Sequence, residues 1–168
     1  MNLPVRHTAR TVAFLLTLGA AMTSGIPGAL AQSSAPPYGP DVTLAVAEKA
    51  VAAALAEAKA KGWRLAVAVV DTHGALVHYS RMEDTQTSGP VIAVEKAKTA
   101  AMFRRSTRVF EEGLAKRPAY LGLPGVTPVI GGVPIVIDGK IAGGIGASGA
   151  ASDEDEAAIL VGLKAIAK

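Results

Sequence analysis

The 168-residue chain contains no cysteine, and aromatic residues make up only 4% of it. The missing cysteine excludes disulfide bonds, catalysis by a thiolate and a lipid anchor attached through sulfur. A G-K-[ST] phosphate-binding signature is also absent, and the chain has no internal repeat. With three histidines in the whole sequence, chemistry that depends on imidazoles has few residues to use.

The first residues have the pattern of a secretory leader. Arg6 and Arg10 precede an apolar run over 12–21, which is too short to span a bilayer. A small-residue cleavage signal follows and ends at Ala31. We therefore expect residues 1–31 to be a signal peptide. The exported protein is predicted to be periplasmic or secreted, with no membrane span in its mature form.

The part of the chain that follows Ala31 suits one domain. Residues 32–40, QSSAPPYGP, are predicted to be a mobile linker, and residues 41–168 a single domain. Loss of the leader removes two arginines and no acid, which leaves 15 basic and 14 acidic residues. Because these charges nearly cancel, the sequence predicts no cationic surface for nucleic acid.

A β-hairpin is the clearest local signal. Two apolar runs flank Asp138-Gly139, a two-residue loop in which both positions accept a positive φ. In the second run Ala142, Gly144 and Gly146 leave one strand face almost bare. We expect a helix, a flat ligand or a second subunit to pack closely on that face. If a second subunit packs there, the protein is a homo-oligomer.

The remaining patterns predict an α+β domain. Helices are expected over 41–61, 89–102, 107–116 and 152–166, with Asp41 and Ser152 as caps of the first and last. Strands are expected over 65–70, 75–81, 129–130, 133–137 and 141–145. Two hairpins predict a largely antiparallel sheet of about five strands with helices packed on its faces. Alternation on the second strand separates Leu76, His78 and Ser80 from Val77, Tyr79 and Arg81.

Three sequence blocks occur together in this chain: VVDTHGALVHYSRMED, EKAKTAAMF, and GGVPIVIDGKIAGGIGASGA followed by DEDEAA. Their combination, from about Leu65 to Ala167, resembles the GlcG/HbpS family (DUF336) of small haem-binding proteins, which includes the C-terminal domain of PduO-type proteins. The resemblance implies a profilin-like fold, assembly into dimers or larger rings, and haem as the cofactor. It names no iron ligand, because axial ligation differs among members.

Chemistry supplies the candidates for that ligand. Outside the leader the imidazoles are His73 and His78. His78 lies on a predicted strand and is the leading axial candidate, with an exposed edge position or a satisfied core contact as alternatives. His73 lies in a predicted turn, where a solvated side chain is the plainer expectation. The further ligand types are Met82, Tyr79 and Tyr120.

Cations near a haem would pair with its propionates, because a guanidinium matches a carboxylate. The candidates are Arg81, Arg104 and Arg105. As an alternative, Arg81 bridges Glu83 or Asp84, and the others are ordinary surface cations.

Three functions stay open. The first is an exported haem-binding protein in haem handling or redox sensing, with a membrane sensor as its partner. The second is an enzyme or accessory protein that acts on a small organic acid in a degradation pathway. The third is a structural homo-oligomer. The scarcity of ionisable side chains that could converge on one pocket favours a binding protein over an enzyme.

Overall fold

The computed structural model describes residues 35–167. The predicted signal peptide and its cleavage site lie outside this range. The described chain forms the helices α1 (Leu44–Lys61), α2 (Gly89–Phe103), α3 (Arg108–Gly113) and α4 (Ser152–Ile166), and a short 3-10 helix over Pro118–Gly122. The strands are β1 (Ala66–Val70), β2 (Leu76–Arg81), β3 (Gly132–Ile137) and β4 (Lys140–Ser148). The predicted strand over 129–130 does not form, so the described sheet has four strands rather than five.

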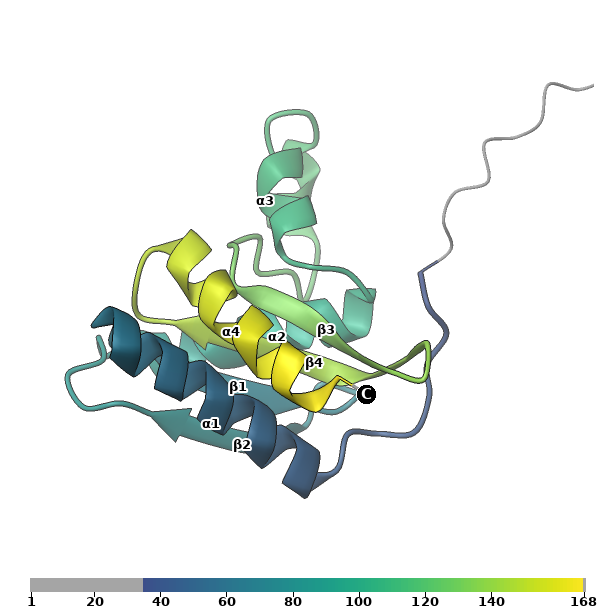
Figure 1. Ribbon diagram of the computed structural model, residues 1–168. Coiled ribbons are helices and arrows are strands. Elements are labelled where there is room, and N and C mark those ends of the chain that lie inside the picture. The colour runs from purple at the N-terminus through teal and green to yellow at the C-terminus, as the bar shows by residue number, and fades with distance from the viewer. Residues whose placement is uncertain (1–34, 168) are drawn as a thin grey trace, which may run out of the picture. The chain divides into compact units, whose positions relative to one another are not determined.

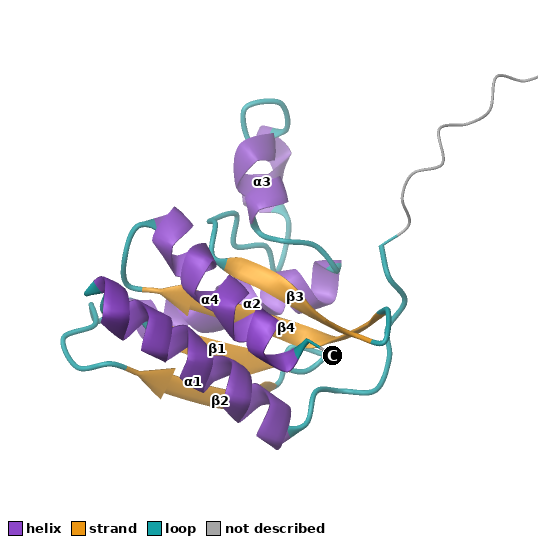
Figure 2. Ribbon diagram, in the orientation of Figure 1, coloured by secondary structure: helices purple, strands orange, loops and turns teal. Residues whose placement is uncertain are grey.

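The four strands form one sheet in the order β2-β1-β4-β3, and all neighbours are antiparallel. Helices α1 and α4 pack side by side on one face (Figure 1). Helix α2 lies on the other face, mainly over β4, with β1 and β3 beside it. Figure 2 shows the strands enclosed between the two helical layers. The α+β prediction is confirmed, and β2 is left largely uncovered on its α2 side.

The predicted Asp138-Gly139 hairpin is confirmed. It joins β3 to β4, and its two turn residues have φ values of 50° and 73°. Positive φ at both central positions gives the turn a twist that matches the flanking strands. An aspartate tolerates this backbone better than most side chains do, and glycine accepts it freely.

The bare face of β4 is covered by a helix of the same chain. A Cβ atom at Gly144 would overlap the carbonyl oxygen of Ala97, and one at Gly146 would overlap that of Ala93. The backbone of α2 therefore lies directly on the strand, which excludes the second-subunit reading for this face. Gly144, Gly146 and Gly149 have the G-x-G-x-x-G spacing, but the first two lie within β4 beneath α2 and do not form a phosphate-binding loop.

Two β-bulges change the predicted side-chain pattern. In β2 the extra residue is Val77, because Val70 pairs with Leu76 and Val69 with His78. The bulge places Leu76 on the α2 side with Tyr79, and His78 on the α1 side with Val69, so these residues do not follow simple alternation. In β4 a second bulge turns Ala142 into the core beneath α1 and α4.

The helix starts differ from the predictions by one or two residues. Thr43 caps α1 through a hydrogen bond from the backbone N–H of Val46, so Asp41 is free for another role. At α4 the cap position is Ala151, whose N–H donates to the Glu154 carboxylate. Ser152 is already within the helix.

The residues before α1 are held to the sheet. Gly39 donates to the carbonyl of Ile141, and Ile141 donates to that of Pro37. Tyr38 forms a parallel bridge with Ile141 between these bonds. The second half of the segment predicted as a linker therefore extends the sheet locally and brings Tyr38 over the end of α2.

A buried ion pair joins the two helical layers. The ammonium group of Lys96 on α2 donates to Asp155 on α4 at 2.9 Å and to the carbonyl of Ala147 at 3.0 Å. Asp155 also accepts the N–H of Ala150. Burial raises the pKa of the Asp155 carboxyl, and the charge of Lys96 opposes that rise.

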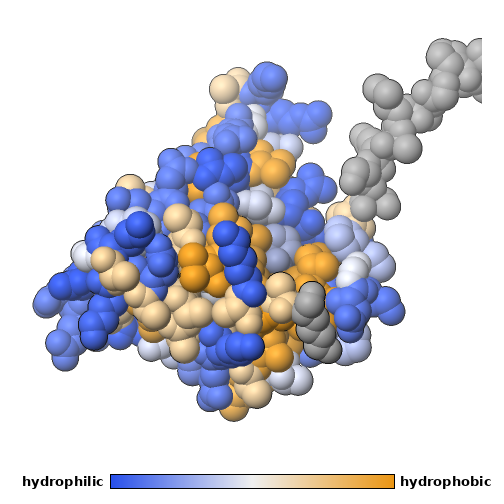
Figure 3. All heavy atoms as spheres, viewed as in Figure 1, coloured by the Kyte–Doolittle hydropathy of each residue, from blue (hydrophilic) through white to orange (hydrophobic). Residues whose placement is uncertain are grey.

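Helix α3 and the chain after it project from one end of the sheet (Figure 1). Phe110 makes edge contacts with Phe103 and Tyr120, with ring centroids 5.5 and 5.3 Å apart, and so fixes the base of this projection. On the face built by α1 and α4, hydrophobic residues gather near the middle and hydrophilic ones lie around them (Figure 3). Within 35–167 no helix is long and apolar enough to cross a membrane.

Candidate functional site

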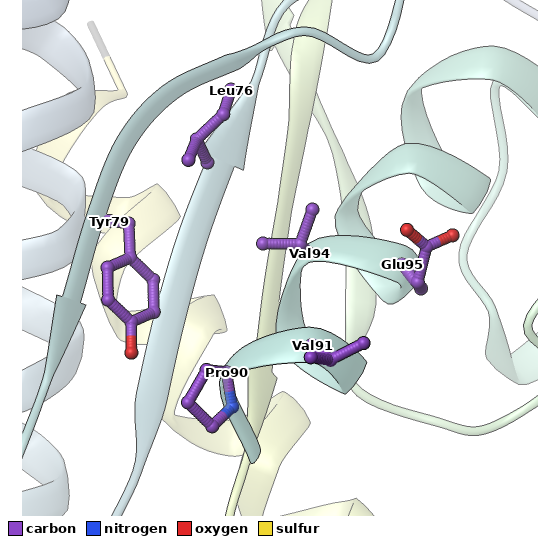
Figure 4. Close-up of a pocket in the computed structure, with 6 residues that line it drawn as sticks. All are labelled: Leu76, Tyr79, Pro90, Val91, Val94 and Glu95. Carbon is purple, nitrogen blue, oxygen red and sulfur yellow. The ribbon is translucent and has the colours of Figure 1, made fainter. Parts of the chain in front are cut away.

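The uncovered side of β2 forms an apolar groove with α2, which we call the α2 groove. It has a volume of about 340 Å³. Its lining is Leu76 and Tyr79 from β2, and Pro90, Val91, Val94 and Glu95 from α2 (Figure 4). Val91 is 67% exposed and Leu76 54% exposed, although both are aliphatic. The groove offers apolar surface with one carboxylate at its margin.

A second hollow, the turn pocket, lies at the other end of the same side of α2. Its volume is about 450 Å³, and it is lined by Tyr38, Gly39, Thr72, His73 and Met102. The turn between β1 and β2 reaches α2 here, because Gly74 lies against the side chains of Lys98 and Met102. Val91, Val94, Lys98 and Met102 follow one another at helical spacing, so the α2 groove and the turn pocket succeed each other along one side of α2.

Two aspartates set the conformation of the turn. Asp71 accepts the backbone N–H groups of His73 and Ala75 at 2.8 and 2.9 Å. Asp41 accepts the backbone N–H and the hydroxyl of Thr72 at 3.0 and 2.6 Å. These bonds from Thr72 lower the pKa of the Asp41 carboxyl, so Asp41 is ionised at neutral pH. The turn is thereby fixed to the segment that precedes α1.

Asp41, Asp71 and His73 each place one potential ligand atom within 4.8 Å of the others. Two carboxylates and an imidazole are donors that a divalent cation accepts. One oxygen of each carboxylate is already engaged with the turn, however. The cluster therefore has a structural role that needs no cation.

Tyr38 lines the turn pocket beside α2, and Arg104 packs on its ring. The Tyr38 hydroxyl donates to the carbonyl of Met102 at 2.7 Å, so it is engaged with the backbone. The guanidinium of Arg104 lies over the Tyr38 ring at 5.3 Å from its centroid and donates to the carbonyl of Pro36. Met102 is 47% exposed. The groups that this pocket offers to a ligand are the His73 ring and the Met102 thioether, and the Arg104 cation lies behind the Tyr38 ring.

Two of the predicted ligands lie on the opposite face of the sheet. His78 is half-buried on the side that α1 covers, because it pairs with Val69 of the main core. Met82 packs against that same core. Neither residue lines the α2 groove or the turn pocket. The structure thus separates His78 and Met82 from His73.

The predicted cations are also separated. Arg81 is exposed at the end of β2, where it pairs with Ala66 near the start of α2. Arg104 follows the other end of α2. In the described part of the chain Arg81 forms no ion pair with Glu83 or Asp84. Arg105 lies over the ring of Phe110. Of the three arginines, Arg104 is the one beside a candidate ligand.

Sequence reasoning missed four residues of the turn pocket. Tyr38 and Gly39 fall in the segment predicted as a linker, Thr72 is a turn residue, and Met102 is the exposed end of a helix. No local pattern marks them, since they come from three separate stretches of chain. They meet because the β1-β2 turn contacts α2 and because Tyr38 pairs with β4 and bonds to the end of α2.

A third hollow of about 780 Å³ lies between the start of α1, the β3-β4 hairpin and the end of α4. Its lining within 35–167 includes Asp41, Asp138 and Lys140 but no histidine, methionine or tyrosine. It therefore has charged groups but no side chain of the types that ligate haem iron.

Comparison with known proteins decides the family. A family model described as "Haem degrading protein HbpS-like" matches residues 42–164. The chain belongs to the HbpS-like family. It is 40% identical to Protein GlcG of Escherichia coli (strain K12) over 104 residues, which are 61% of this chain and 78% of GlcG. It is 29% identical over 119 residues to an uncharacterized 15.0 kDa protein encoded in the dhaT-dhaS intergenic region of Citrobacter freundii, with 68% and 84% covered.

Solved structures of HbpS-like proteins have the same fold. A double mutant of Streptomyces reticuli HbpS superposes with a TM-score of 0.74 at 27% identity, over 95% of this chain and all of the other. A PduOC:heme complex superposes with a TM-score of 0.68 at 22% identity, over 74% of this chain and 94% of the other. The resemblance to this family is therefore confirmed, and a PduOC:heme complex shares the fold of the chain.

Proposed function

We propose that this HbpS-like protein binds haem in the turn pocket, with His73 as an axial ligand of the iron. The observation that carries the proposal is the place of His73. It is an exposed imidazole at a pocket whose volume of about 450 Å³ lies within the usual range for small-molecule sites. The other imidazole of the described chain, His78, faces the α1 side.

The donors of the turn pocket fit a haem group. Imidazole nitrogen and thioether sulfur are both axial ligands of haem iron, and His73 and Met102 supply them. Arg104 lies over the ring of Tyr38, a lining residue, and its guanidinium suits a propionate. The apolar residues of the neighbouring α2 groove would shield part of a porphyrin from water. When bound, haem supplies an iron centre that takes up small ligands and changes its redox state.

Paired substitutions of the two histidines test the proposal. Haemin titration of the wild type should give a saturable Soret shift. His73→Ala should weaken binding by roughly tenfold or more and alter the spectrum, as expected for loss of an axial ligand. His78→Ala is the matched control and should leave affinity and spectrum close to wild type. If His78→Ala loses the haem spectrum and His73→Ala keeps it, His78 is the axial ligand instead. If haemin gives no Soret shift with the wild type, the haem proposal is wrong.

We also propose that the protein acts after export, in haem handling or redox sensing outside the cytoplasm. The support is the leader pattern that ends at Ala31, together with membership of the HbpS-like family. The intact mass of the exported product tests the first part. A product that begins at or near Gln32 is expected, and an exported protein that retains residues 1–31 would contradict it.

A further inference from the structure

We infer that Asp41, acting through the hydroxyl of Thr72, holds the side-chain proton of neutral His73 on Nδ1 and leaves the Nε2 lone pair free for a ligand. The inference deepens the haem proposal, on which its consequence for iron rests, but the position of the proton is a property of the protein alone. Asp41 and Thr72 are then positioning residues for the ligand.

The hydroxyl of Thr72 contacts the carboxylate of Asp41. Oγ1 of Thr72 lies 2.6 Å from Oδ1 of Asp41. Two oxygens approach so closely only when a hydrogen lies between them, and the ionised carboxylate has none to give. The single hydroxyl hydrogen of Thr72 therefore points to Asp41. The backbone N–H of Thr72 donates to the same oxygen at 3.0 Å, which holds the carboxylate in this orientation.

The ring of His73 contacts the same hydroxyl. Its Nδ1 lies 3.2 Å from Thr72 Oγ1. Since that oxygen has already donated its hydrogen, it can only accept here, and Nδ1 must carry the hydrogen. In a neutral imidazole the other nitrogen then has a free lone pair. Asp71 accepts the backbone N–H of the same residue, so both the backbone and the ring of His73 are held by hydrogen bonds.

The chain Asp41, Thr72 and His73 resembles the support that metal-ligating histidines usually have. A ring N–H that donates toward a carboxylate fixes the tautomer and makes the other nitrogen a stronger donor. A stronger nitrogen donor stabilises ferric iron more than ferrous iron. We call the hydrogen-bonded chain from Asp41 through Thr72 to His73 the relay. It would therefore lower the reduction potential of a haem bound through Nε2 of His73.

Nitrogen NMR of the haem-free protein with a neutral His73 ring tests the inference first. The His73 signals, assigned by comparison with His78→Gln, should show Nδ1 protonated in the wild type. Thr72→Val keeps the shape of the side chain but removes the acceptor, so it should shift the hydrogen toward Nε2. Thr72→Ser restores the hydroxyl and should restore the wild-type tautomer. Protonation of Nε2 in the wild type would overturn the inference.

The haem complex gives the second readout. Thr72→Val and Asp41→Asn should raise the reduction potential, and Thr72→Ser should not. A roughly tenfold change in the preference for ferric over ferrous iron corresponds to about 59 mV for one electron. If haemin does not bind but the tautomers behave as expected, the haem proposal fails and the relay stands. If haemin binds and neither tautomer nor potential responds to Thr72→Val, the relay fails alone.

Discussion

Lys96 on α2 and Asp155 on α4 form an ion pair of 2.9 Å with both side chains at most 2% exposed. The pair crosses the edge of the fold where β4 passes into α4, and Lys96 also donates to the carbonyl of Ala147 at the end of β4. It therefore joins the helices on opposite faces of the sheet. A buried charge that loses its partner is costly, because the low-dielectric interior cannot solvate it.

Lys96→Met should lower the free energy of unfolding by about 3 kcal/mol, since it leaves the Asp155 carboxylate buried and unpaired. Urea denaturation at pH 7 measures the loss. Lys96→Met combined with Asp155→Asn should recover part of it, because the uncompensated charge is then absent. The interpretation fails if the single and double variants are equally stable.

The same variant should show a particular pH dependence. Burial raises the pKa of Asp155, and Lys96 opposes that rise, so Lys96→Met should raise the pKa further. A carboxyl whose folded pKa exceeds its unfolded value favours the folded state as pH falls through that folded value. The deficit of Lys96→Met relative to wild type should therefore shrink between pH 7 and pH 5. A deficit that grows on acidification would contradict this account.

Gly146→Ala should destabilise the domain by roughly 1 to 3 kcal/mol, because its Cβ would overlap the carbonyl oxygen of Ala93 in α2. Gly122→Ala is a suitable control, since nothing lies near the position of its Cβ. The control should change stability by less than about 0.5 kcal/mol. Thermal or urea unfolding of the two variants makes the comparison, and equal stability would show that α2 can move away from β4.

Arg104→Gln should weaken haemin binding by roughly tenfold, because it removes the cation beside the turn pocket. Arg81→Gln removes an equal charge at the opposite end of the α2 side and should leave the affinity near wild type. A higher salt concentration should reduce the difference in haemin affinity between wild type and Arg104→Gln, because salt screens the attraction between the guanidinium and a propionate. A larger loss in Arg81→Gln than in Arg104→Gln would move the propionates, and with them the haem, away from His73.

Asp41 should contribute to the free energy of unfolding by an amount that depends on pH. Its pKa is lowered by hydrogen bonds from Thr72, so its ionised form stabilises the folded state at pH values above the ordinary aspartate pKa of 3.8. That contribution is lost as pH falls through the lower folded pKa. The stability advantage of wild type over Asp41→Asn should be constant between pH 7 and pH 5 and diminish below about pH 4. Unfolding at three pH values in this range tests the sign.

The local parts of this fold could be predicted because they depend on neighbouring residues. Asp138-Gly139 specifies its own turn, and the apolar runs beside it have the length and composition of strands. The antiparallel α+β arrangement follows from two such hairpins. The bulges at Val77 and Ala142 could not be predicted, because each arises from the fit of a whole strand to its neighbour.

The turn pocket is harder to predict from the sequence than the fold. The sequence favours His78 because it is one of two imidazoles outside the leader and lies on a predicted strand, but the structure pairs it with Val69 on the α1 side of the sheet. The turn predicted at His73 is confirmed, yet Asp41, which orients the ring through Thr72, lies 31 positions before Thr72 in the chain. Such a contact depends on where the segment before α1 is fixed, and no sequence period encodes that.

The inner and outer sides of helix α2 have different surroundings. On its inner side Ala93, Ala97 and Ala101 rest on the backbone of β4. On its outer side Val91, Glu95 and Met102 line the α2 groove and the turn pocket. Substitutions on the outer side therefore leave the fold almost untouched, whereas those on the inner side do not. Related chains can diverge in what they bind along this helix and still share one architecture, and the helix is also the place to begin when a new ligand preference is to be engineered.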